Sequence, residues 1–298
     1  MSGPGAIVTA DLSRPPLKLA AALFAFAAFS ASASASVGLD ATKAQWGQAQ
    51  ANAMASRAPG PIAGQGYHLA FKDDFNHFRK HVWTRRIWYD DRPQHNWNRF
   101  QYVKHGVLHL RTGRSYAATC HTCSNGDWPI NTITTLKSRS FRQGYFEARM
   151  TWSKGQGAWP GFWLYSTQHA KDENQCSTNA GEIDVFEGQG SEPKVYYGTV
   201  HSNTNGCSPA DQQNDNNWHP VGKDLTKRFH RYGTLWTKDR VTWYLDGRKL
   251  MSAPTYGSDD QRMFLLLQMW VGGWMGDPNG STPDVIQTKV AWVKVWRQ

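Results

Sequence analysis

From Tyr67 onward the chain is a succession of short apolar and aromatic segments separated by Gly, Asn, Asp and Pro, without a long amphipathic helix. Many short strands at this spacing are typical of an antiparallel sandwich or barrel and not of a parallel α/β fold. We see no repeat of fixed period, so one β domain over residues 67–298 is predicted. The predicted strands are 67–71, 100–103, 107–112, 132–138, 144–152, 161–165, 182–187, 195–201, 230–236, 240–245, 248–250, 263–271 and 289–296.

Two tight turns connect strands in this pattern. Asp246-Gly247 lies between apolar segments, and His105-Gly106 precedes the alternating residues that begin at Val107. Asp-Gly at the centre of a two-residue loop is the signal of a type I′ turn, because both residues must adopt positive φ angles. A β-hairpin is therefore expected at each site.

The segment from Gly181 to Gly188 carries three carboxylates, Glu182, Asp184 and Glu187, with apolar residues between them. On a regular strand Glu182 and Asp184 share a face, while Glu187, five residues after Glu182, points to the opposite face. One extra residue in the strand, most simply at Val185-Phe186, resets the alternation. We therefore predict a β-bulge that brings all three acids to one side.

Like charges held so close repel, which destabilises the fold unless a proton is shared or a ligand uses the arrangement. One ionised and one protonated carboxyl group beside a scissile bond are the groups that a glycosidase needs. Acids alternating with apolar residues are also the ordinary solvent face of a half-buried strand. These six residues alone leave both interpretations open.

The N-terminus resembles an export signal. Arg14 and Lys18 precede an apolar run over 19–29, and Ala33-Ser34-Ala35 offers a cleavage site. This run is too short to span a bilayer as a helix, so we interpret residues 1–35 as a signal peptide and expect a secreted or periplasmic protein with no membrane association after cleavage. An uncleaved anchor is the alternative. Residues 36–66, rich in Ala, Gln, Gly and Pro, are predicted to form a linker or N-terminal arm.

Charge and aromatic content limit the partners. Without residues 1–35 the chain has 31 basic and 22 acidic residues, a formal net charge of +9. Such a charge suggests an anionic partner or a generally basic surface, but the basic residues are scattered and form no nucleic-acid motif, so nucleic acid is not expected. Fifteen Trp, 11 Tyr and 13 Phe are typical of a protein that stacks flat ligands such as sugars or nucleobases.

Four cysteines, an even number in a chain expected to be exported, favour disulfide bonds with three possible connectivities. We expect Cys120 to pair with Cys123 and Cys176 with Cys207. Cys120 and Cys123 are spaced as half of a zinc site, but no second cysteine pair follows at the usual spacing.

Several motifs resemble, in order, those of glycoside hydrolase family 16, the concanavalin-like β-jelly-roll enzymes that include laminarinases, lichenases, agarases, carrageenases and exopolysaccharide glycanases. The resemblance implies an all-β sandwich of two antiparallel sheets with a concave substrate cleft. It rests on Asp73-Asp74-Phe75, residues 144–150, 157–163, the acidic segment 182–187, 198–201, 229–236, 243–247, Gly272-Gly273 and 290–296.

Glu182, Asp184 and Glu187 fill the bulged active-site pattern of that family, Glu-x-Asp-x-x-Glu. The resemblance implies that Glu182 is the nucleophile and Glu187 the acid/base of a retaining, endo-acting β-glycanase, with Asp184 tuning both. Neither a metal nor an organic cofactor is required. Family members often bind structural calcium through an acid in the last strand, but Ala291 stands near that position, which argues against the ion.

The resemblance also suggests substrate-binding residues. Trp159, in the segment that matches the cleft strand, is the best candidate for stacking against sugar. Trp270, Trp274, Trp88 and His201 are the further candidates, each with a structural role as the alternative. Trp163 is interpreted as a core residue, and Gln268 is given no role.

The segment from Ser115 to Asn131 matches no known part of the family and is predicted to be a loop that sets specificity. A monomer acting on a polysaccharide is expected, most simply a β-1,3- or β-1,3-1,4-glucan, with an acidic exopolysaccharide as the other choice. The alternatives on the same fold are a glycan-binding protein, which would lack one Glu of the pair, and a transglycosylase, whose plant representatives lack the extra strand residue.

Overall fold

The computed structural model describes residues 59–85, 100–114, 128–168, 170, 180–203, 212–258 and 260–298, with side chains except at 180, 203 and 212–217. All of them belong to the compact unit Ser56–Gln298. Within these described ranges, no helix is long and apolar enough to cross a bilayer. Trp88, the four cysteines and residues 115–127 of the predicted specificity loop lie outside the described residues.

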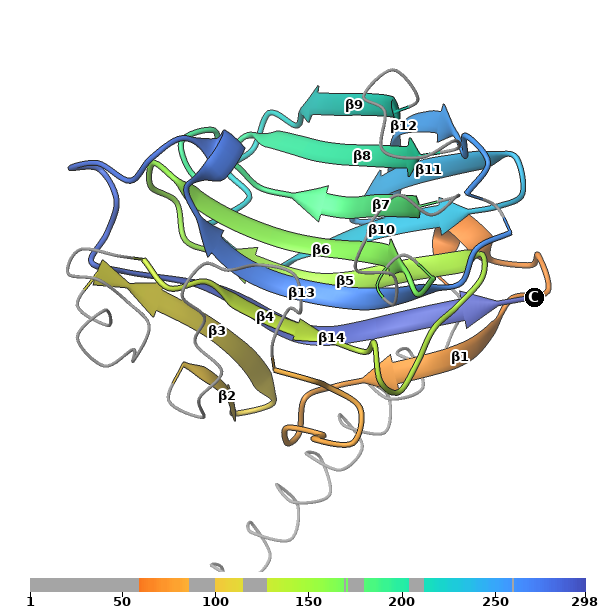
Figure 1. The fold of residues 1–298 in the computed structure, drawn as a ribbon, viewed down its shortest axis with the longest axis horizontal. Coiled ribbons are helices and arrows are strands. Elements are labelled where there is room, and N and C mark those ends of the chain that lie inside the picture. Colours follow the sequence, from red (N-terminus) through yellow and green to blue (C-terminus); the bar gives the residue numbers. More distant parts are fainter. Residues whose placement is uncertain are drawn as a thin grey trace, which may run out of the picture. The chain divides into compact units, whose positions relative to one another are not determined.

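Strands make up nearly all of the regular structure in the described part of the chain (Figure 1). Two short 3-10 helices are η1 (Gly60–Ile62) and η5 (Gly273–Met275). The strands are β1 (His68–Asp73), β2 (Gln101–Lys104), β3 (Val107–Gly113), β4 (Asn131–Thr134), β5 (Gly144–Trp152), β6 (Ala158–Ser166), β7 (Ala180–Glu187), β8 (Val195–Asn203), β9 (Gln212–Pro220), β10 (His230–Trp236), β11 (Arg240–Leu245), β12 (Arg248–Pro254), β13 (Met263–Val271) and β14 (Val285–Arg297).

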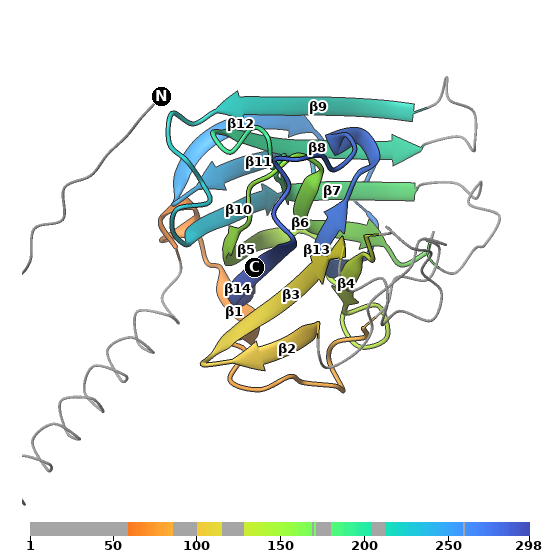
Figure 2. The ribbon, with the colours of Figure 1, turned by 90° about the vertical axis from the view of Figure 1, so that its left-hand side faces the viewer.

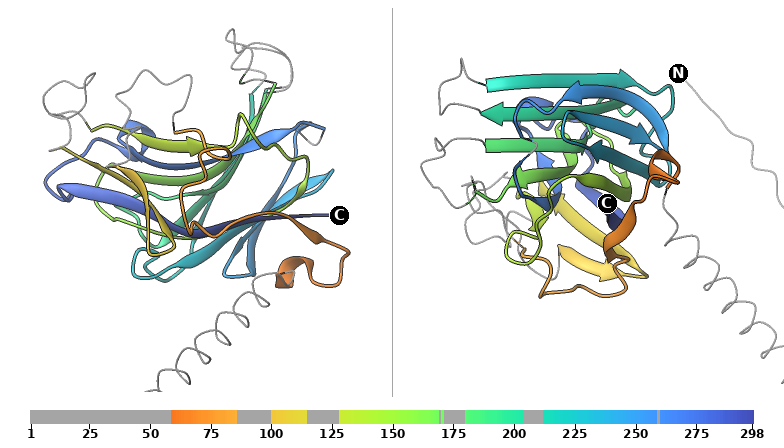
Figure 3. Two further views of the ribbon diagram at one scale, coloured as in Figure 1. Left: turned by 90° about the horizontal axis from the view of Figure 1, so that it is seen from below. Right: turned by 90° about the vertical axis from the view of Figure 1, so that its right-hand side faces the viewer.

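These strands form two antiparallel sheets. The six-stranded sheet has the order β4-β13-β6-β7-β8-β9, which places β7 in its interior. The eight-stranded sheet has the order β12-β11-β10-β5-β14-β3-β2, and β1 pairs with β14. Figures 1 and 2 show the two sheets as facing layers, and Figure 3 shows how strongly their strands curve. The chain is thus a β-sandwich of the predicted jelly-roll class.

Alternation along the strands fills the space between the layers. The eight-stranded sheet contributes Phe146, Met150 and Val293, and the six-stranded sheet contributes Phe162, Ile183 and Leu265. All six side chains are fully buried, and burial of side chains of this size stabilises the fold by about 1.5 to 3 kcal/mol each. The faces that turn away from this core remain available for function.

Residues just before Tyr67, the predicted start of the domain, contact the sandwich. Ile62, which lies in the predicted linker, is fully buried and packs with Tyr145 and Trp296 on the outer side of the eight-stranded sheet. The Gln298 side-chain amide donates a hydrogen bond to the Gln65 carbonyl oxygen at 3.1 Å. Ile62 of the predicted arm therefore packs on the sandwich, although the sequence around it has no strand pattern.

Both predicted hairpins are confirmed. Asp246 and Gly247 have φ angles of 54° and 84°, and His105 and Gly106 have 51° and 69°. Positive φ at both central residues is the signature of the type I′ turn. The turns connect β11 to β12 and β2 to β3.

Strand β9 is the element that sequence patterning does not predict. Its sequence, QQNDNNWHP, contains one large apolar residue and so lacks the alternation of a half-buried strand. It forms the edge of the six-stranded sheet and pairs along its whole length with β8. Polar residues suit such an edge because they discourage pairing with another chain.

Candidate active site

The predicted bulge in β7 is present at the predicted position. On β8, Asp184 pairs with Thr199 and Glu187 with Tyr197, so three steps on β7 face two steps on its neighbour. On β6, Phe186 pairs with Phe162 and Asp184 with Trp163, which leaves Val185 as the extra residue. Val185 and Phe186 are both fully buried in the core. The alternation therefore resets, and Glu182, Asp184 and Glu187 share the face of the sheet turned away from the core, which we name the acid face.

Two aromatic side chains in the core bond the backbone at the bulge. Trp243, on β11 of the opposite sheet, donates its indole N–H to the carbonyl oxygen of Asp184 at 2.7 Å. The Tyr196 hydroxyl donates to the carbonyl oxygen of Val185. Gly198 makes room for the indole, since a Cβ there would lie 2.5 Å from Trp243 Nε1. The bulge, and with it the direction of Glu187, is thus held from inside the core.

We predict that Trp243→Phe destabilises the protein by about 1 to 3 kcal/mol, because the buried Asp184 carbonyl loses its donor. Activity should fall further than stability explains, since the spacing between the acids depends on the bulge. Chemical denaturation and kcat on a soluble β-glucan measure the two effects. Trp236→Phe is the matched control, because its buried indole nitrogen has no hydrogen-bond partner among the described residues. Equal activity losses in both variants would contradict this role for Trp243.

Cross-strand neighbours surround each acid on the acid face. Asp184 lies between Trp163 and Thr199, Glu182 between Tyr165 and His201, and Glu187 between Gly161 and Tyr197. Trp163 is buried, as predicted, yet it belongs to a second apolar cluster with Phe264, Leu266 and Trp270 and not to the core between the sheets. The sequence alone does not show that Trp163 lies beside Asp184, because this pairing of β6 with β7 depends on the position of the bulge.

Trp159 contacts the predicted acid/base directly. Its indole N–H donates to Glu187 Oε1 at 2.7 Å. The Trp159 ring makes edge-to-face contacts with Trp270 and Trp274, with ring centroids 5.1 and 6.0 Å apart. Trp159 is half-buried, so it both orients Glu187 and keeps part of its ring at the surface. Its predicted stacking role stays a prediction, to which the structure adds this hydrogen bond.

Burial and charge repulsion raise the pKa values of both glutamates. Glu187 is nearly inaccessible, and its pKa lies well above the usual range, chiefly because of burial and then because of the Asp184 charge. The hydrogen bond from Trp159 opposes this shift. Burial and Asp184 also raise the pKa of Glu182, while His201 lowers it. These shifts favour the protonated form of the two glutamates, and a glycosidase site needs one such carboxyl group as its general acid.

Trp159→Phe is predicted to move the alkaline limb of the activity profile to higher pH. A donated N–H stabilises the ionised carboxylate and lowers its pKa, so removing it raises the pKa of Glu187 further and the acid keeps its proton longer. The measurement is kcat/KM between pH 5 and 10. Trp163→Phe is the control, because the Trp163 indole nitrogen has no hydrogen-bond partner among the described residues. An alkaline limb that stayed in place or moved to lower pH would refute the assignment.

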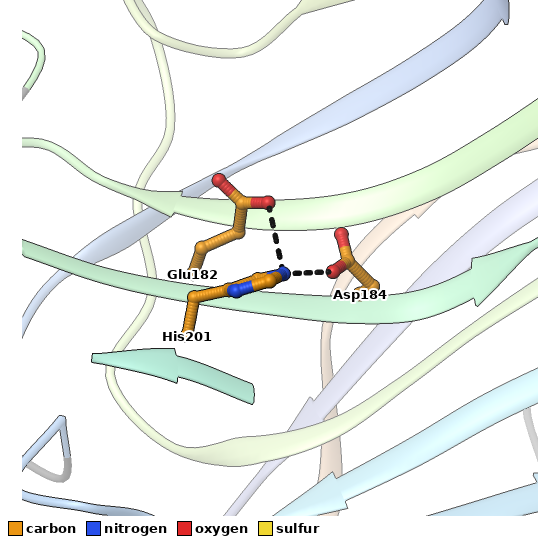
Figure 4. A group of neighbouring side chains, drawn as sticks. All are labelled: Glu182, Asp184 and His201. Atoms are coloured by element: carbon orange, nitrogen blue, oxygen red, sulfur yellow. Dashed lines mark ion pairs between the residues drawn. The ribbon is translucent and has the colours of Figure 1, made fainter. Parts of the chain in front are cut away.

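His201 reaches the acids from β8 (Figure 4). Its Nε2 lies 3.3 Å from Asp184 Oδ2 and 3.9 Å from Glu182 Oε1. The imidazole is 39% exposed and so is open to solvent on one side. The atoms of Glu182, Asp184 and His201 that could bind a metal all lie within 4.8 Å of one another.

Two exposed aromatic residues, Trp274 and Trp218, neighbour Tyr197, which pairs with Glu187. Trp274, on η5, is 52% exposed and makes an edge-to-face contact with Tyr197 at 5.3 Å. Trp218 on β9 pairs with Tyr197 and is 63% exposed, so it lies on the acid face as well. Trp270 is buried and donates its N–H to Thr132 Oγ1 at 2.7 Å, which leaves little of it for a sugar. Neither Tyr197 nor Trp218 was predicted as a site residue. Trp218 lies in β9, whose sequence has no strand pattern.

Glycines and one amide shape the surroundings of Glu187. A Cβ at Gly161 would lie 2.9 Å from the side chain of Gln268, so this amide covers the glycine next to Glu187. Gln268, given no role from sequence, is thus a neighbour of the site. Gly272 and Gly273 have φ angles of 79° and 67°, and a Cβ at Gly273 would lie 2.7 Å from the Trp159 ring. Only glycine fits this approach of η5 to Trp159.

The donor set for calcium does not fit at the expected position. Ala291 lies where the pairing of β14 with β5 shifts register, and its side chain offers no ligand oxygen. The expectation that calcium is not bound remains a prediction.

Residues 96–294 match the family described as glycosyl hydrolases family 16. The chain belongs to this family. The endo-1,3-1,4-beta-glycanases EglC and ExsH of Rhizobium meliloti are 31% and 28% identical to it over 195 and 194 residues, each covering 65% of this chain. The endo-beta-1,3-glucanase structure from Pyrococcus furiosus aligns with a TM-score of 0.64 and 25% identity, covering 77% of this chain and 94% of that one.

The matches to the two Rhizobium proteins span 39% of the length of each. The family match, residues 96–294, covers most of the sandwich and includes β7 with its three acids. Family membership therefore applies to the segment that carries the acids.

Proposed function

We propose that this protein is an endo-acting, retaining β-glycanase that hydrolyses internal β-glycosidic bonds of a polysaccharide. The observation that carries the proposal is the bulge at Val185, which places Glu182, Asp184 and Glu187 together on one face. Both glutamates of the pair are present, so a non-catalytic glycan-binding protein is disfavoured. The names of the rhizobial and archaeal relatives, all endo-acting enzymes on β-linked glycans, support the same class.

The mechanism is a double displacement. The Glu182 carboxylate attacks the anomeric carbon while the Glu187 carboxyl protonates the departing glycosidic oxygen, so the C–O bond breaks as an ester to Glu182 forms. Glu187, now ionised, takes a proton from water, whose oxygen displaces Glu182 from the anomeric carbon. Two inversions restore the original configuration, and Glu187 regains its proton. The reaction uses these two side chains and water alone.

Exposed aromatic rings support binding of a chain of sugars. Trp274, Tyr197 and Trp218 follow the acid face from Glu187 to the edge strand β9. Flat aromatic faces suit the apolar faces of pyranose rings, and a row of them suits a polymer better than a disaccharide. A β-1,3- or β-1,3-1,4-glucan is the primary substrate class, and the basic net charge supports an acidic exopolysaccharide as the second.

A depolymerisation panel tests this proposal. Laminarin, lichenan, agarose, carrageenan and a succinoglycan-like acidic polymer are incubated with the protein, and reducing ends and viscosity are followed together. An endo-acting enzyme lowers viscosity before many reducing ends appear and releases a range of oligosaccharides. Release of monosaccharide alone would refute endo action. Degradation of the acidic polymer but not of laminarin or lichenan would select the second substrate class.

Export and oligomeric state are part of the proposal. The apolar run over 19–29 and the Ala33-Ser34-Ala35 site support cleavage after residue 35. N-terminal sequencing of protein recovered from the periplasm or medium should begin at Ser36. The protein is proposed to act as a monomer and to need no cofactor, which sedimentation and dialysis against a chelator would test.

A further inference from the structure

The cluster of Glu182, Asp184 and His201 combines two carboxylates with an imidazole on adjacent strands (Figure 4). Asp184 is 3% exposed, and its Oδ2 is buried without a hydrogen bond from any residue that the structure describes. His201 is its ion-pair partner only when the imidazole is protonated, and a buried anionic oxygen without a hydrogen-bond donor is costly, so beside a neutral His201 this atom favours a bound cation. It faces His201 Nε2, which is the ring nitrogen nearer to both acids.

The distances from His201 Nε2 to the two acids are close to the ligand separations around a small divalent metal ion. Tetrahedral zinc with bonds of about 2.1 Å holds its ligand atoms about 3.4 Å apart. Asp184 Oδ2 and His201 Nε2 are already 3.3 Å apart, and Glu182 Oε1 is 3.9 Å from the same nitrogen. The Glu182 side chain is about one-quarter exposed and has rotatable bonds, so it can approach a metal without moving the backbone.

The ligand types indicate which metals fit. Imidazole with carboxylates suits zinc and copper, whereas magnesium and calcium prefer oxygen ligands alone. The exposed side of the His201 ring gives an ion a path from solvent. Three protein ligands leave a fourth position for water. Glu187, the next acid along β7, already accepts a hydrogen bond from Trp159 at its Oε1.

We propose that Glu182, Asp184 and His201 form a reversible binding site for a divalent transition metal, with zinc as the representative ion, and that metal binding inhibits the enzyme. The metal uses the Glu182 oxygen that the proposed reaction needs for attack on the anomeric carbon. Metal and substrate therefore exclude each other. The consequence for activity rests on the proposed function, whereas binding itself does not.

Calorimetric titration of the full chain with zinc chloride tests binding without a substrate. The wild-type protein should bind one zinc ion at this site, and His201→Ala should weaken binding at least tenfold, since loss of a mere supporting contact to a metal ligand already costs about 10- to 100-fold. His201→Gln should behave in the same way and serves as a second variant if His201→Ala does not fold. His109→Ala is the matched control, because His109 lies on β3 of the other sheet. Magnesium should produce no binding signal.

Two results would overturn the site. Equal zinc affinity in the wild type and both folded His201 variants would place the ion elsewhere, and thiolate-to-cobalt absorption on titration with Co²⁺ would place it at the cysteines. Inhibition of depolymerisation is measured separately. Zinc should raise the apparent KM, and a chelator should return the KM to its value without zinc. Zinc binding at His201 without inhibition would disprove the inhibitory role, while lack of activity without zinc would instead count against the proposed function.

Discussion

Replacing Glu182 with Gln is expected to lower kcat on the polysaccharide substrate by at least about 10⁴-fold, because removal of a covalent nucleophile is among the most damaging changes to an enzyme. The amide keeps the shape of the side chain but cannot attack the anomeric carbon. Substrate binding should persist, since the aromatic residues beside Glu187 are untouched. The measurement is the initial rate of reducing-end release, together with glycan affinity by calorimetry.

The fold of this variant should be at least as stable as the wild type at neutral pH. The raised pKa of Glu182 means that the folded protein holds this proton more tightly than the unfolded chain does. Ionising the group above its unfolded-state pKa therefore costs stability, and Gln removes that cost at neutral pH but not below about pH 4. If Glu182→Gln lost activity because it was unfolded, its stability at neutral pH would instead be lower than that of the wild type.

Azide distinguishes a nucleophile from a merely supporting carboxylate. In Glu182→Ala, azide can enter the space of the missing side chain and attack the anomeric carbon of an aryl β-glycoside, giving an α-glycosyl azide by one inversion. Recovery of activity with this product would establish the role of Glu182. Substantial hydrolysis by Glu182→Gln without azide would contradict it.

Replacing Glu187 with Gln is expected to lower kcat on the polysaccharide by about 10² to 10⁴-fold, the usual contribution of general acid–base catalysis. The loss should be much smaller in the first step with an aryl β-glycoside, because a phenolate with a low pKa leaves without protonation. Burst kinetics with such a substrate separate formation of the intermediate from its hydrolysis.

The Glu187 variant should respond to azide differently from the Glu182 variant. In Glu187→Ala, azide attacks the glycosyl-enzyme formed on Glu182, so the product is a β-glycosyl azide after two inversions. Asp184→Asn is the matched comparison, since Asp184 lies between Glu182 and Glu187 but does not react in the proposed mechanism. Equal losses on activated and unactivated substrates in Glu187→Gln would contradict its assignment as the acid.

The sequence predicted most of the fold because local signals and tertiary structure agree there. The turns at His105-Gly106 and Asp246-Gly247 require positive φ angles, and the alternation of β11 matches its burial. Strand β9 could not be predicted from propensity, because backbone pairing with β8 at an edge forms it and its polar side chains carry no pattern. The packing of Ile62 likewise depends on contacts distant in sequence.

The position of the bulge in β7 followed from charge and alternation, since only an extra residue brings three acids to one face. What holds it could not be inferred, because Trp243 comes from the opposite sheet and its contact with Asp184 is set by sandwich geometry. The bond from Trp159 to Glu187 and the closeness of Gln268 to the site depend in the same way on strand register. Residue types indicated the chemistry, and tertiary structure determined which neighbours support it.

Trapping the covalent intermediate tests the central claim most directly. In a 2-deoxy-2-fluoro β-glycoside the fluorine slows both steps, and a good leaving group keeps the first step faster than the second. The glycosyl-enzyme therefore accumulates and can be digested for mass spectrometry. The bulged arrangement of β7 predicts one added glycosyl group per chain, carried by the peptide that contains Glu182 and located on that residue. A label on Glu187 or Asp184, or turnover that yields the inverted anomer without a label, would contradict it.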